Sequence, residues 1–581
     1  MHAAWGHWGP AGGTRCTTVA HMMPFSPLFA RQYSPLSQNS SLRPRVSWGL
    51  ALLLSLVMTG CSSLPSQVDR PVSNALTDNA DTRLGQAVAA RAATAGTRND
   101  SGFALVGSAE LAFSSRMTLI QAAQKTLDLQ YYAIHADDTT ERLFDALREA
   151  ASRGVRIRIL LDDFNTAGKN AQMLKLAFEK NIAVRLFNPL PSGRGSPLFR
   201  IVSSLGDIAK LQRRMHNKIF VADNAVAITG GRNLGETYFG QGEGTNFIDV
   251  DVLAAGRIAR DLSRSFDQYW NNPLAYPVQS LMTAKDIDAL KQLPPRADQE
   301  LSAEQGQNSA APLTRTATAP DGLTSTLPAL PSSTNLRLLT WTWAPSVMLV
   351  DKPSKIAADA DSVGESQDTA VDGLLQLMAQ AKSDVLVVSP YFVPGARMMR
   401  QFADMRARGV RVRVLTNSLA SNDAPAAHVG YARYREALLG LGIEMYEMRA
   451  EQGGSRAGLG ALTGSAGNSN GASRASLHAK VVVVDSRLLV VGSMNLDLRS
   501  QLQNSEVAVV IRSPALAQEA TRMIEPALVS GAYRVQAVEG QLVWRAPQGS
   551  GLPDARSEPD AGFGQKLLLR LIAPFAPDEI L

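Results

Sequence analysis

Two short stretches of this chain carry the same polar residues at the same spacing. In each, a His is followed two residues later by a Lys and five residues after that by an Asp, and a small pair, Gly-Gly or Gly-Ser, then comes shortly before an Asn. Equivalent members lie 262 positions apart, and this constant offset indicates a duplicated unit. The members are His216, Lys218, Asp223 and Asn233 in the first copy and His478, Lys480, Asp485 and Asn495 in the second.

Two His, two Lys and two Asn side chains around one anion suit a phosphodiester. Ammonium and amide groups hold the non-bridging oxygens as negative charge builds in the transition state. One imidazole attacks phosphorus while the other protonates the departing alcohol and later takes a proton from the incoming one. This chemistry requires no metal and no cofactor.

A nucleophilic imidazole must be neutral and must present a free Nε2, so an acceptor is expected at its Nδ1 hydrogen. Glu506 opens the segment EVAVVIRS, and Asp249 opens the similar segment DVDVLAAG. Both segments follow a copy of the motif and are predicted strands. We therefore expect Asp249 and Glu506 to orient the two imidazoles.

Asp223 and Asp485 complete the two motifs, but their position suggests a different task. Each lies in an Asp-Asn or Asp-Ser turn between two apolar runs. A carboxylate in such a turn usually caps backbone amides or pairs with a neighbouring base. We assign both residues a supporting role.

The apolar runs around these turns predict a buried β-hairpin in each copy. Residues i and i+2 of a strand point to the same face, so the His and the Lys of one copy project together. The small pair, Gly-Gly or Gly-Ser, lets the chain turn tightly and brings the Asn amide back beside them.

The rest of each half reads as alternating strands and helices. LDLQYYAI predicts a strand, a helix follows over about 140–152 and ends at Arg153-Gly154, and VRIRILLDD predicts the next strand. DVLVVSPYF, a helix through Met398–Met405, Arg408-Gly409 and VRVRVLTNS repeat this order. The pattern predicts an α/β fold of two duplicated lobes, each a mixed or parallel sheet flanked by helices, with one site shared at their interface.

Aromatic residues and a His near the predicted strand ends are candidates for the walls of this site, because α/β sheets build their sites beyond the carboxyl ends of strands. Core packing is the alternative for each of them. His428, in AAHVGYARYR, fits either the pocket or a helix surface. The candidates at the strand ends are Tyr131, Tyr132, His135, Tyr391 and Phe392.

The double HxKxxxxD motif with its GGxN or GSxN tail resembles the phospholipase D superfamily. A closer similarity, to the C-type bacterial cardiolipin synthases, rests on LDLQYYAIHADDTTERLFDALREAASRGVRIRILLDD, NLGETYFG, DVDVLAAG and NSLASNDAPAAHVGYARYREALLGLGIEMYEM. It covers most of residues 101–545. The resemblance implies a covalent phosphohistidine intermediate, with the His of the N-terminal half as nucleophile.

The start of the chain is typical of an exported lipoprotein. An apolar run, Val46–Met58, follows two arginines and ends at Met-Thr-Gly-Cys, which resembles a bacterial lipobox and predicts lipidation of Cys61. The alternatives are a plain signal anchor and an ordinary signal sequence with an incidental Cys. We expect a protein of the bacterial cell envelope that faces the periplasm, on the outer membrane rather than the inner one. Cys16 and Cys61 leave no disulfide in the processed chain.

Composition supports the same division of the chain. Residues 1–60 contain four Arg and no acid, so removing them lowers the net charge from +6 to about +2, which gives no nucleic-acid signature. The predicted parts are a signal segment 1–60, a tether 61–100, a first domain 101–273, a flexible linker 274–335, a second domain 336–545 with a low-complexity insertion 453–473, and a tail 546–581.

These observations favour a phosphatidyltransferase that forms cardiolipin from phosphatidylglycerol and a second phospholipid, such as phosphatidylethanolamine. A hydrolytic phospholipase D has the same motif, because transfer and hydrolysis diverge only after the intermediate. A phosphodiesterase nuclease fits the low charge less well, and a non-catalytic envelope lipoprotein requires a broken motif. The apolar tail QKLLLRLIAPFAPDEIL either rests on a membrane surface or docks against the body; an accessory protein is left open.

Overall fold

The computed structural model describes most of the chain after the predicted leader. It covers residues 64–572, with gaps at 98, 167, 191–207, 243–244, 293–314, 319–323, 328–329, 332, 358–367 and 452–473. The signal segment, Cys61 and the low-complexity insertion 453–473 therefore lie outside the described residues. Within the described ranges, no helix combines the length and the apolarity that crossing a bilayer requires.

The first lobe is built on a mixed sheet of nine strands in the order β12-β1-β8-β6-β5-β2-β3-β4-β9. β2, β3 and β4 are parallel, and the other neighbours are antiparallel. The strands are β1 (Ser101–Val106), β2 (Thr126–Tyr131), β3 (Arg156–Asp162), β4 (Ile182–Phe187), β5 (Ile219–Ala222), β6 (Val226–Gly230), β8 (Asp251–Gly256), β9 (Ala275–Pro277) and β12 (Thr342–Ala344).

The second lobe repeats this arrangement in the order β13-β20-β19-β18-β14-β15-β16-β21-β22. Parallel β14, β15 and β16 occupy the places of β2, β3 and β4, and the hairpin β18–β19 occupies that of β5–β6. The predicted duplication and both predicted hairpins are confirmed. The strands are β13 (Ser346–Val350), β14 (Asp384–Val388), β15 (Arg411–Asn417), β16 (Glu444–Met448), β18 (Val481–Val484), β19 (Leu488–Gly492), β20 (Val507–Arg512), β21 (Ala532–Val538) and β22 (Gln541–Arg545).

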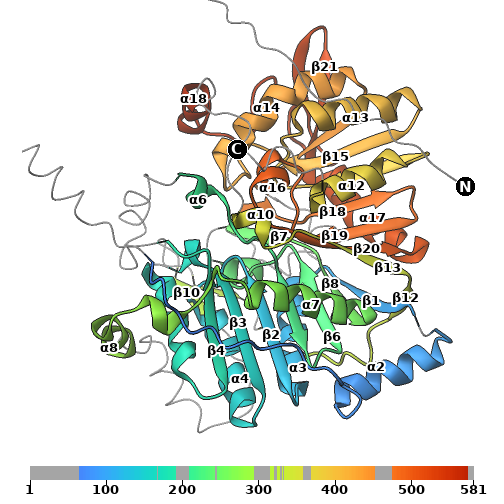
Figure 1. Ribbon diagram of the computed structural model, residues 1–581. Helices are drawn as coiled ribbons and strands as arrows, with labels where there is room; N and C mark the ends of the chain where they lie inside the picture. Colours follow the sequence, from blue (N-terminus) through green and yellow to red (C-terminus); the bar gives the residue numbers. More distant parts are fainter. Residues whose placement is uncertain are drawn as a thin grey trace, which may run out of the picture. The chain divides into compact units, whose positions relative to one another are not determined.

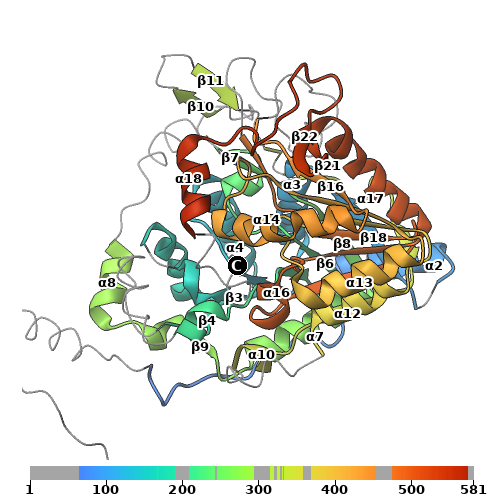
Figure 2. The same ribbon diagram turned by 90° about the horizontal axis from the view of Figure 1, so that it is seen from above.

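Helices cover both faces of the two sheets, and local sequence signals fix several of their ends. The Ser108 hydroxyl caps α3, and Asp137 opens α4 with a capping box. α4 ends before Gly154, whose φ of 93° suits a residue without a side chain. In Figure 2, α12 and α13 lie side by side over the second sheet. The helices are α3 (Ala109–Ala122), α4 (Asp138–Ser152), α7 (Arg257–Trp270), α12 (Ala370–Ala379), α13 (Gly395–Ala407), α14 (Pro425–Gly440) and α17 (Pro514–Pro526).

The two lobes share apolar packing and are not independent. Val252 of β8 belongs to the same buried cluster as Val491 of β19 and Val509 of β20. α7 lies on the side of the first sheet that faces the second lobe, where its Ala259 packs in a cluster with Val507 (Figure 1). Burial of these side chains fixes one lobe against the other.

The chain passes between the lobes later than the sequence predicted. β12 pairs with β1 in the first sheet, and β13 pairs with β20 in the second, so the crossing falls at Pro345. The predicted boundary at residue 336 was too early. The predicted linker also contains structure: α8 (Ala284–Gln292) and the short hairpin of β10 (Arg315–Thr318) and β11 (Thr324–Leu327).

The segment predicted as a tether is docked on the first lobe. Its backbone carbonyls accept side-chain donors of the sheet: Arg158 donates to Ser73 O at 2.5 Å and Arg185 to Pro71 O at 2.6 Å. It then forms α2 (Arg83–Thr94), which begins at a Thr82 cap. The prediction of a free spacer was wrong for residues 64–97.

The tail is docked as well. Trp544 and Ala555 exchange backbone hydrogen bonds, and Glu558 pairs with Arg435 of α14 at 3.0 Å. α18 (Phe563–Ile572) then packs against α14 (Figure 2). The sequence allowed the tail either to rest on a membrane surface or to dock against the body. The described residues 546–572 dock against the body.

Replacing Asp267 by Ala tests the docking of the N-terminal segment. Its carboxylate accepts the Ala75 amide at 2.8 Å and pairs with Arg158 at 2.8 Å. Loss of a charge-assisted hydrogen bond costs about 1.5–3 kcal/mol. We therefore expect thermolysin, which cleaves on the amino side of leucine, to cut the folded variant between Ala75 and Leu76 about ten times faster than the parent chain.

Asp261→Ala is the matched control, because Asp261 lies on the same helix and pairs with Arg257 and Arg264 of that helix. It should leave cleavage between Ala75 and Leu76 unchanged. Equal rates for the parent and both variants would contradict the docking.

Candidate active site

The first motif approaches the second lobe before its hairpin begins. The His216 amide donates to Ser505 O at 2.9 Å, and the Ser505 amide donates to Arg214 O at 3.0 Å. Immediately after His216 and Lys218, the chain enters β5 of the first sheet. The position of His216 is therefore set by backbone bonds to the opposite lobe.

The second motif is held in the equivalent way. Before it, β17 (Arg474–Leu477) pairs in parallel with β7 (Thr245–Ile248) of the first lobe. The His478 amide donates to Ile248 O at 2.8 Å. The duplicated halves thus exchange equivalent contacts across their interface.

The same exchange pairs each imidazole with a carboxylate of the other lobe. His216 Nδ1 lies 3.0 Å from both carboxylate oxygens of Glu506, and His478 Nδ1 lies 2.6 Å from Asp249 Oδ2. A carboxylate can only accept, so Nδ1 carries the hydrogen and Nε2 remains available for chemistry. The sequence placed Asp249 and Glu506 beside the imidazoles but did not predict that the pairs cross between lobes.

The two Lys side chains add buried positive charge. Lys218 Nζ donates to His216 O at 2.8 Å, and Lys480 Nζ donates to His478 O at 2.6 Å. Burial lowers the pKa of Lys218 to about 7 and that of Lys480 to about 8, although nearby carboxylates oppose the change. An anion bound between these ammonium groups would stabilise their charged forms.

The imidazoles differ in how strongly their neutral forms are favoured. Burial, reinforced by Lys218 and Lys480, places the pKa of His216 well below its ordinary value. Burial and Lys480 also lower the pKa of His478, but the Asp249 carboxylate opposes them. His216 is therefore suited to act as a neutral nucleophile, and His478 is closer to a group that can carry a proton.

The motif amides lie at the ends of the hairpins. Asn233 Nδ2 donates to the Tyr238 hydroxyl at 3.0 Å, and its Oδ1 accepts the Ala133 amide at 3.3 Å. Asn495 Oδ1 is buried and has no hydrogen-bond partner within the part of the chain that the structure describes. Both amides remain candidates for holding phosphoryl oxygens.

Aromatic rings form walls around both imidazoles. The Tyr132 ring meets His216 edge-on at 5.1 Å, and Tyr238 and Phe247 lie 5.3 Å and 5.1 Å from His478. His135 stacks on Tyr238 at 6.2 Å. Sequence reasoning missed Tyr238 and Phe247. Phe247 lies two residues before Asp249, and this strand spacing is a signal that could have found it.

Of the remaining aromatic residues that the sequence suggested for the walls, one lies near the site and two lie in the cores of the lobes. Tyr391 donates to Asp423 at 2.8 Å, and the charge of Asp423 acts on Lys480 and Tyr238, so this pair lies near the site. Tyr131 is buried beside Arg116, and Phe392 packs in the core of the second lobe.

His428 lies neither in the site nor on a helix surface. Its side chain is buried, and its Nε2 lies 3.4 Å from Glu558 and 3.2 Å from Arg435. Both predicted alternatives for this residue were wrong, because the tail covers this part of α14.

The two motif aspartates cap backbone amides far from phosphoryl chemistry. Asp223 accepts the amides of Gln124, Lys125 and Thr126 at 2.7–3.2 Å. Asp485 accepts those of Lys382, Ser383 and Asp384. Each carboxylate thus ties the turn of its hairpin to the start of the neighbouring strand, β2 or β14.

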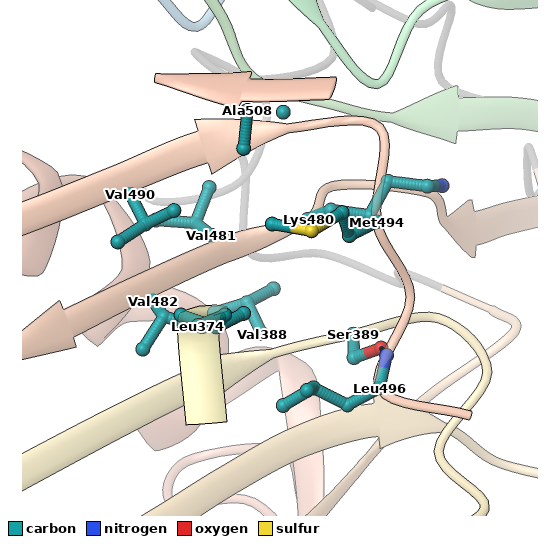
Figure 3. A pocket seen from close by; sticks show the side chains of 11 residues that line it. Leu374, Val388, Ser389, Lys480, Val481, Val482, Val490, Met494, Leu496 and Ala508 are labelled. Carbon is teal, nitrogen blue, oxygen red and sulfur yellow. Dashed lines mark hydrogen bonds between the residues drawn. The ribbon is translucent and has the colours of Figure 1, made fainter. Parts of the chain in front are cut away.

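A small cavity lies behind Lys480 in the second lobe, between the sheet and α12 (Figure 3). Valine, leucine and methionine side chains form most of its lining, so it offers little to a phosphate. The candidate site is the polar cluster around the imidazoles. Among the described residues, no cluster of three or more His, Cys, Asp and Glu side chains is arranged to hold a metal ion.

Comparisons with known proteins agree with this geometry. The family model described as "Cardiolipin synthase, PLD-like domain" matches residues 117–270 and 374–527, one match in each half. Cardiolipin synthase C of Escherichia coli (strain K12) is 33% identical over 482 residues, which cover 81% of this chain and 94% of that protein. Cardiolipin synthase B of Salmonella typhimurium (strain LT2) is 21% identical over 416 residues, covering 72% and 78%.

Among solved structures, the phosphatidylserine synthase of Haemophilus influenzae Rd KW20 has a similar fold. It aligns with a TM-score of 0.51 and 14% sequence identity, and the alignment covers 85% of this chain and 99% of that one. At this identity the likeness is one of fold.

Removing the buried cap tests the supporting role of the first aspartate. Asp223→Ala leaves three backbone amides without their acceptor, and we expect the free energy of unfolding to fall by about 2–4 kcal/mol in urea titrations. Asp485→Ala serves as the matched variant. Its surroundings are more exposed, so water replaces the lost acceptor and we expect a loss of about 1 kcal/mol. A larger loss for Asp485→Ala would contradict this account.

The lowered pKa values of the two lysines predict that anion binding depends on pH. Lys218 and Lys480 are largely charged at about pH 6 and lose their charge as the pH rises through about 7 and 8. Sulfate stays a dianion throughout, so its inhibition constant should increase by at least about tenfold between about pH 6 and about pH 9. Lys218→Met should reduce this dependence. An inhibition constant that does not change with pH would show that the ammonium groups do not hold the anion.

Proposed function

Since the chain belongs to the phospholipase D superfamily, with two domains of the cardiolipin synthase type, we propose that it transfers phosphatidyl groups and forms cardiolipin from phosphatidylglycerol and a second phospholipid. Its similarity to cardiolipin synthase C supports phospholipids as substrates. The observation that carries the proposal is the crossed pairing of His216 with Glu506 and of His478 with Asp249.

In the first step, the Nε2 lone pair of His216 attacks the phosphorus of the donor lipid. The bond between phosphorus and the oxygen of the departing glycerol or ethanolamine breaks, and His478 gives its Nε2 proton to that oxygen. The product is a phosphatidyl group bound to His216 and a neutral alcohol. Glu506 holds the Nδ1 hydrogen of His216 as positive charge builds on the ring.

In the second step, a hydroxyl of the acceptor lipid loses its proton to His478 while its oxygen attacks phosphorus. The phosphorus–nitrogen bond breaks, and its electron pair returns to His216 Nε2. Both imidazoles then regain their starting protonation states, so the cycle needs no other proton donor. Each bond that forms replaces one that breaks, and the phosphate of the acceptor lipid does not react.

Lys218, Lys480, Asn233 and Asn495 hold the non-bridging oxygens through both steps. Their burial makes these contacts strong, because water is not present to screen the ammonium charges. The donors are in place before the reaction starts, so little reorganisation is needed as negative charge builds on the phosphoryl oxygens.

Limited access for water favours transfer over hydrolysis. Only 8% of His216 and 5% of His478 is exposed, and aromatic rings lie against both imidazoles. Water and an alcohol compete for the same intermediate, so a site that excludes water favours the lipid hydroxyl. We also propose that lipidation of Cys61 anchors the enzyme in the bacterial envelope, facing the periplasm; this rests on the sequence around Cys61.

Substituting each imidazole tests the assigned roles. With phosphatidylglycerol labelled in its phosphate, with and without phosphatidylethanolamine, we expect His216→Ala and His478→Ala to lower cardiolipin formation by more than about 10³-fold. A phosphatidyl ester of p-nitrophenol needs no protonation on departure, so it should restore intermediate formation in His478→Ala but not in His216→Ala.

His428→Gln is the control for losing a buried histidine elsewhere in the fold. It should retain turnover, because His428 contacts the tail and lies outside the site. The proposal fails if both alanine variants keep more than trace activity, and labelled phosphatidic acid as the sole product of the parent chain would favour hydrolysis.

A further inference from the structure

The two motifs differ at one position beside the carboxylates that hold the imidazoles. The small pair is Gly-Gly in the first copy and Gly-Ser in the second, so Gly231 corresponds to Ser493. A Cβ atom at Gly231 would lie 2.2 Å from Asp249 Oδ1. That oxygen accepts the Val250 amide at 2.8 Å. In the first copy, the carboxylate itself therefore occupies the space that a side chain would need.

In the second copy, a hydroxyl stands between the backbone and the carboxylate. The Val507 amide, equivalent to that of Val250, donates to Ser493 Oγ at 3.0 Å. Ser493 Oγ in turn donates to Glu506 Oε2 at 2.5 Å. Ser500 Oγ donates to the other oxygen, Oε1, at 2.9 Å.

The two imidazoles consequently have different acceptors. Glu506 accepts from two hydroxyls as well as from His216, whose Nδ1 lies 3.0 Å from both oxygens. His478 has a single, shorter contact of 2.6 Å with Asp249. Among the described residues, no side-chain hydroxyl donates to Asp249. The Glu506 carboxylate therefore accepts from three side chains, His216, Ser493 and Ser500. The Asp249 carboxylate makes a shorter hydrogen bond with its imidazole, that of His478.

We infer that Ser493 and Ser500 are positioning residues that determine which imidazole acts as the nucleophile and which as the proton donor. By binding the Glu506 carboxylate, the hydroxyls leave His216 as the neutral nucleophile, while Asp249 makes His478 the proton donor. This inference rests on the proposed two-step transfer and explains which imidazole attacks. The hydroxyls keep their own protons; they act only through Glu506.

Lys218 and Lys480 act on both carboxylates, so these two charges do not distinguish the pairs. The further groups that face Glu506 are Lys355, Asp351, Asp497 and Tyr269. Those that face Asp249 are Arg232 and Tyr238. Those that face the His216 ring are His478, Arg499 and Tyr132.

The hydroxyls also affect the pH at which the His216–Glu506 pair takes up a proton. Burial raises the pKa of Glu506, and Lys218 and the two hydroxyls oppose that rise because they stabilise the carboxylate. A proton on the pair blocks attack at either position. On Nε2 it occupies the lone pair, and on Glu506 it removes the acceptor of the Nδ1 hydrogen. Removing one donor therefore moves the loss of nucleophilic activity to higher pH.

The test measures the first step as a function of pH. The full chain is mixed with phosphatidylglycerol labelled in its phosphate, in detergent micelles, and the labelled phosphohistidine is quantified after rapid quenching in base. We expect Ser493→Ala and Ser500→Ala each to shift the acidic limb of the rate profile upward by about one to two pH units, the equivalent of one hydrogen bond to a charged group. Ser493→Thr keeps a hydroxyl, so the acidic limb of its rate profile should lie at the same pH as that of the parent chain.

Ser513→Ala is the matched control, because Ser513 is a buried serine that follows β20 at the end opposite Glu506, where its hydroxyl accepts the Leu516 amide. This variant should leave the acidic limb of the rate profile at the pH of the parent chain. If Ser493→Ala and Ser500→Ala slow the reaction equally at all pH values, the hydroxyls only support the fold and the inference is overturned. If the parent chain forms no phosphohistidine, the proposed function fails first and the inference with it. Ser500→Ala gives an independent result if Ser493→Ala does not fold.

Discussion

Each motif imidazole donates its Nδ1 hydrogen to a carboxylate of the opposite lobe, and the rest of the site depends on this exchange. His216 needs Glu506 from the second lobe, and His478 needs Asp249 from the first. Neither lobe alone can orient its own imidazole. The shared apolar core between the sheets therefore does more than stabilise the fold, because it fixes the distance across which these bonds form.

Burying these ionisable groups costs desolvation free energy, and their hydrogen bonds within the protein offset only part of that cost. Two lysines, two imidazoles and two carboxylates lie almost out of contact with water. Each carboxylate is satisfied by donors, but among the described residues the lysine ammonium groups donate to backbone carbonyls of their own motifs and to no carboxylate. The lowered pKa values of the lysines express this imbalance. An anion bound by both ammonium groups, such as the phosphodiester of the proposed reaction, would offset this imbalance and gain binding energy from it.

The sequence predicted the motifs, the hairpins and the α/β lobes because these depend on local spacing. Asp249 and Glu506 were also placed near the imidazoles, by the similarity of two strands. Their crossing could not be predicted, because it arises from pairing between segments more than 200 residues apart, such as β7 with β17. Periodicity carries no information about which lobe supplies a partner.

The predictions that failed did so for a related reason. Residues 64–97 have no clear apolar period, and they dock through backbone carbonyls, which leave no sequence signature. His428 is covered by Glu558, which is 130 residues away in the chain and lies in a segment without a motif. Local patterns identify groups that can do chemistry, but contacts made by the backbone or by distant acids become visible only in the folded chain.

A duplicated fold creates a difficulty for two-step phosphoryl transfer, because equivalent halves tend to supply equivalent groups while the reaction needs a nucleophile and an acid. Here the backbone exchange is nearly symmetric, from the amide bonds of the imidazole residues to the hairpins that follow them. The difference lies in the small pair, in the carboxylates beside it and in the Ser500 hydroxyl, which donates to Glu506. Gly231 lets Asp249 approach its backbone amide directly, whereas Ser493 places a hydroxyl between the equivalent amide and Glu506. A nearly symmetric scaffold thus surrounds its two imidazoles with different hydrogen-bond donors and acceptors.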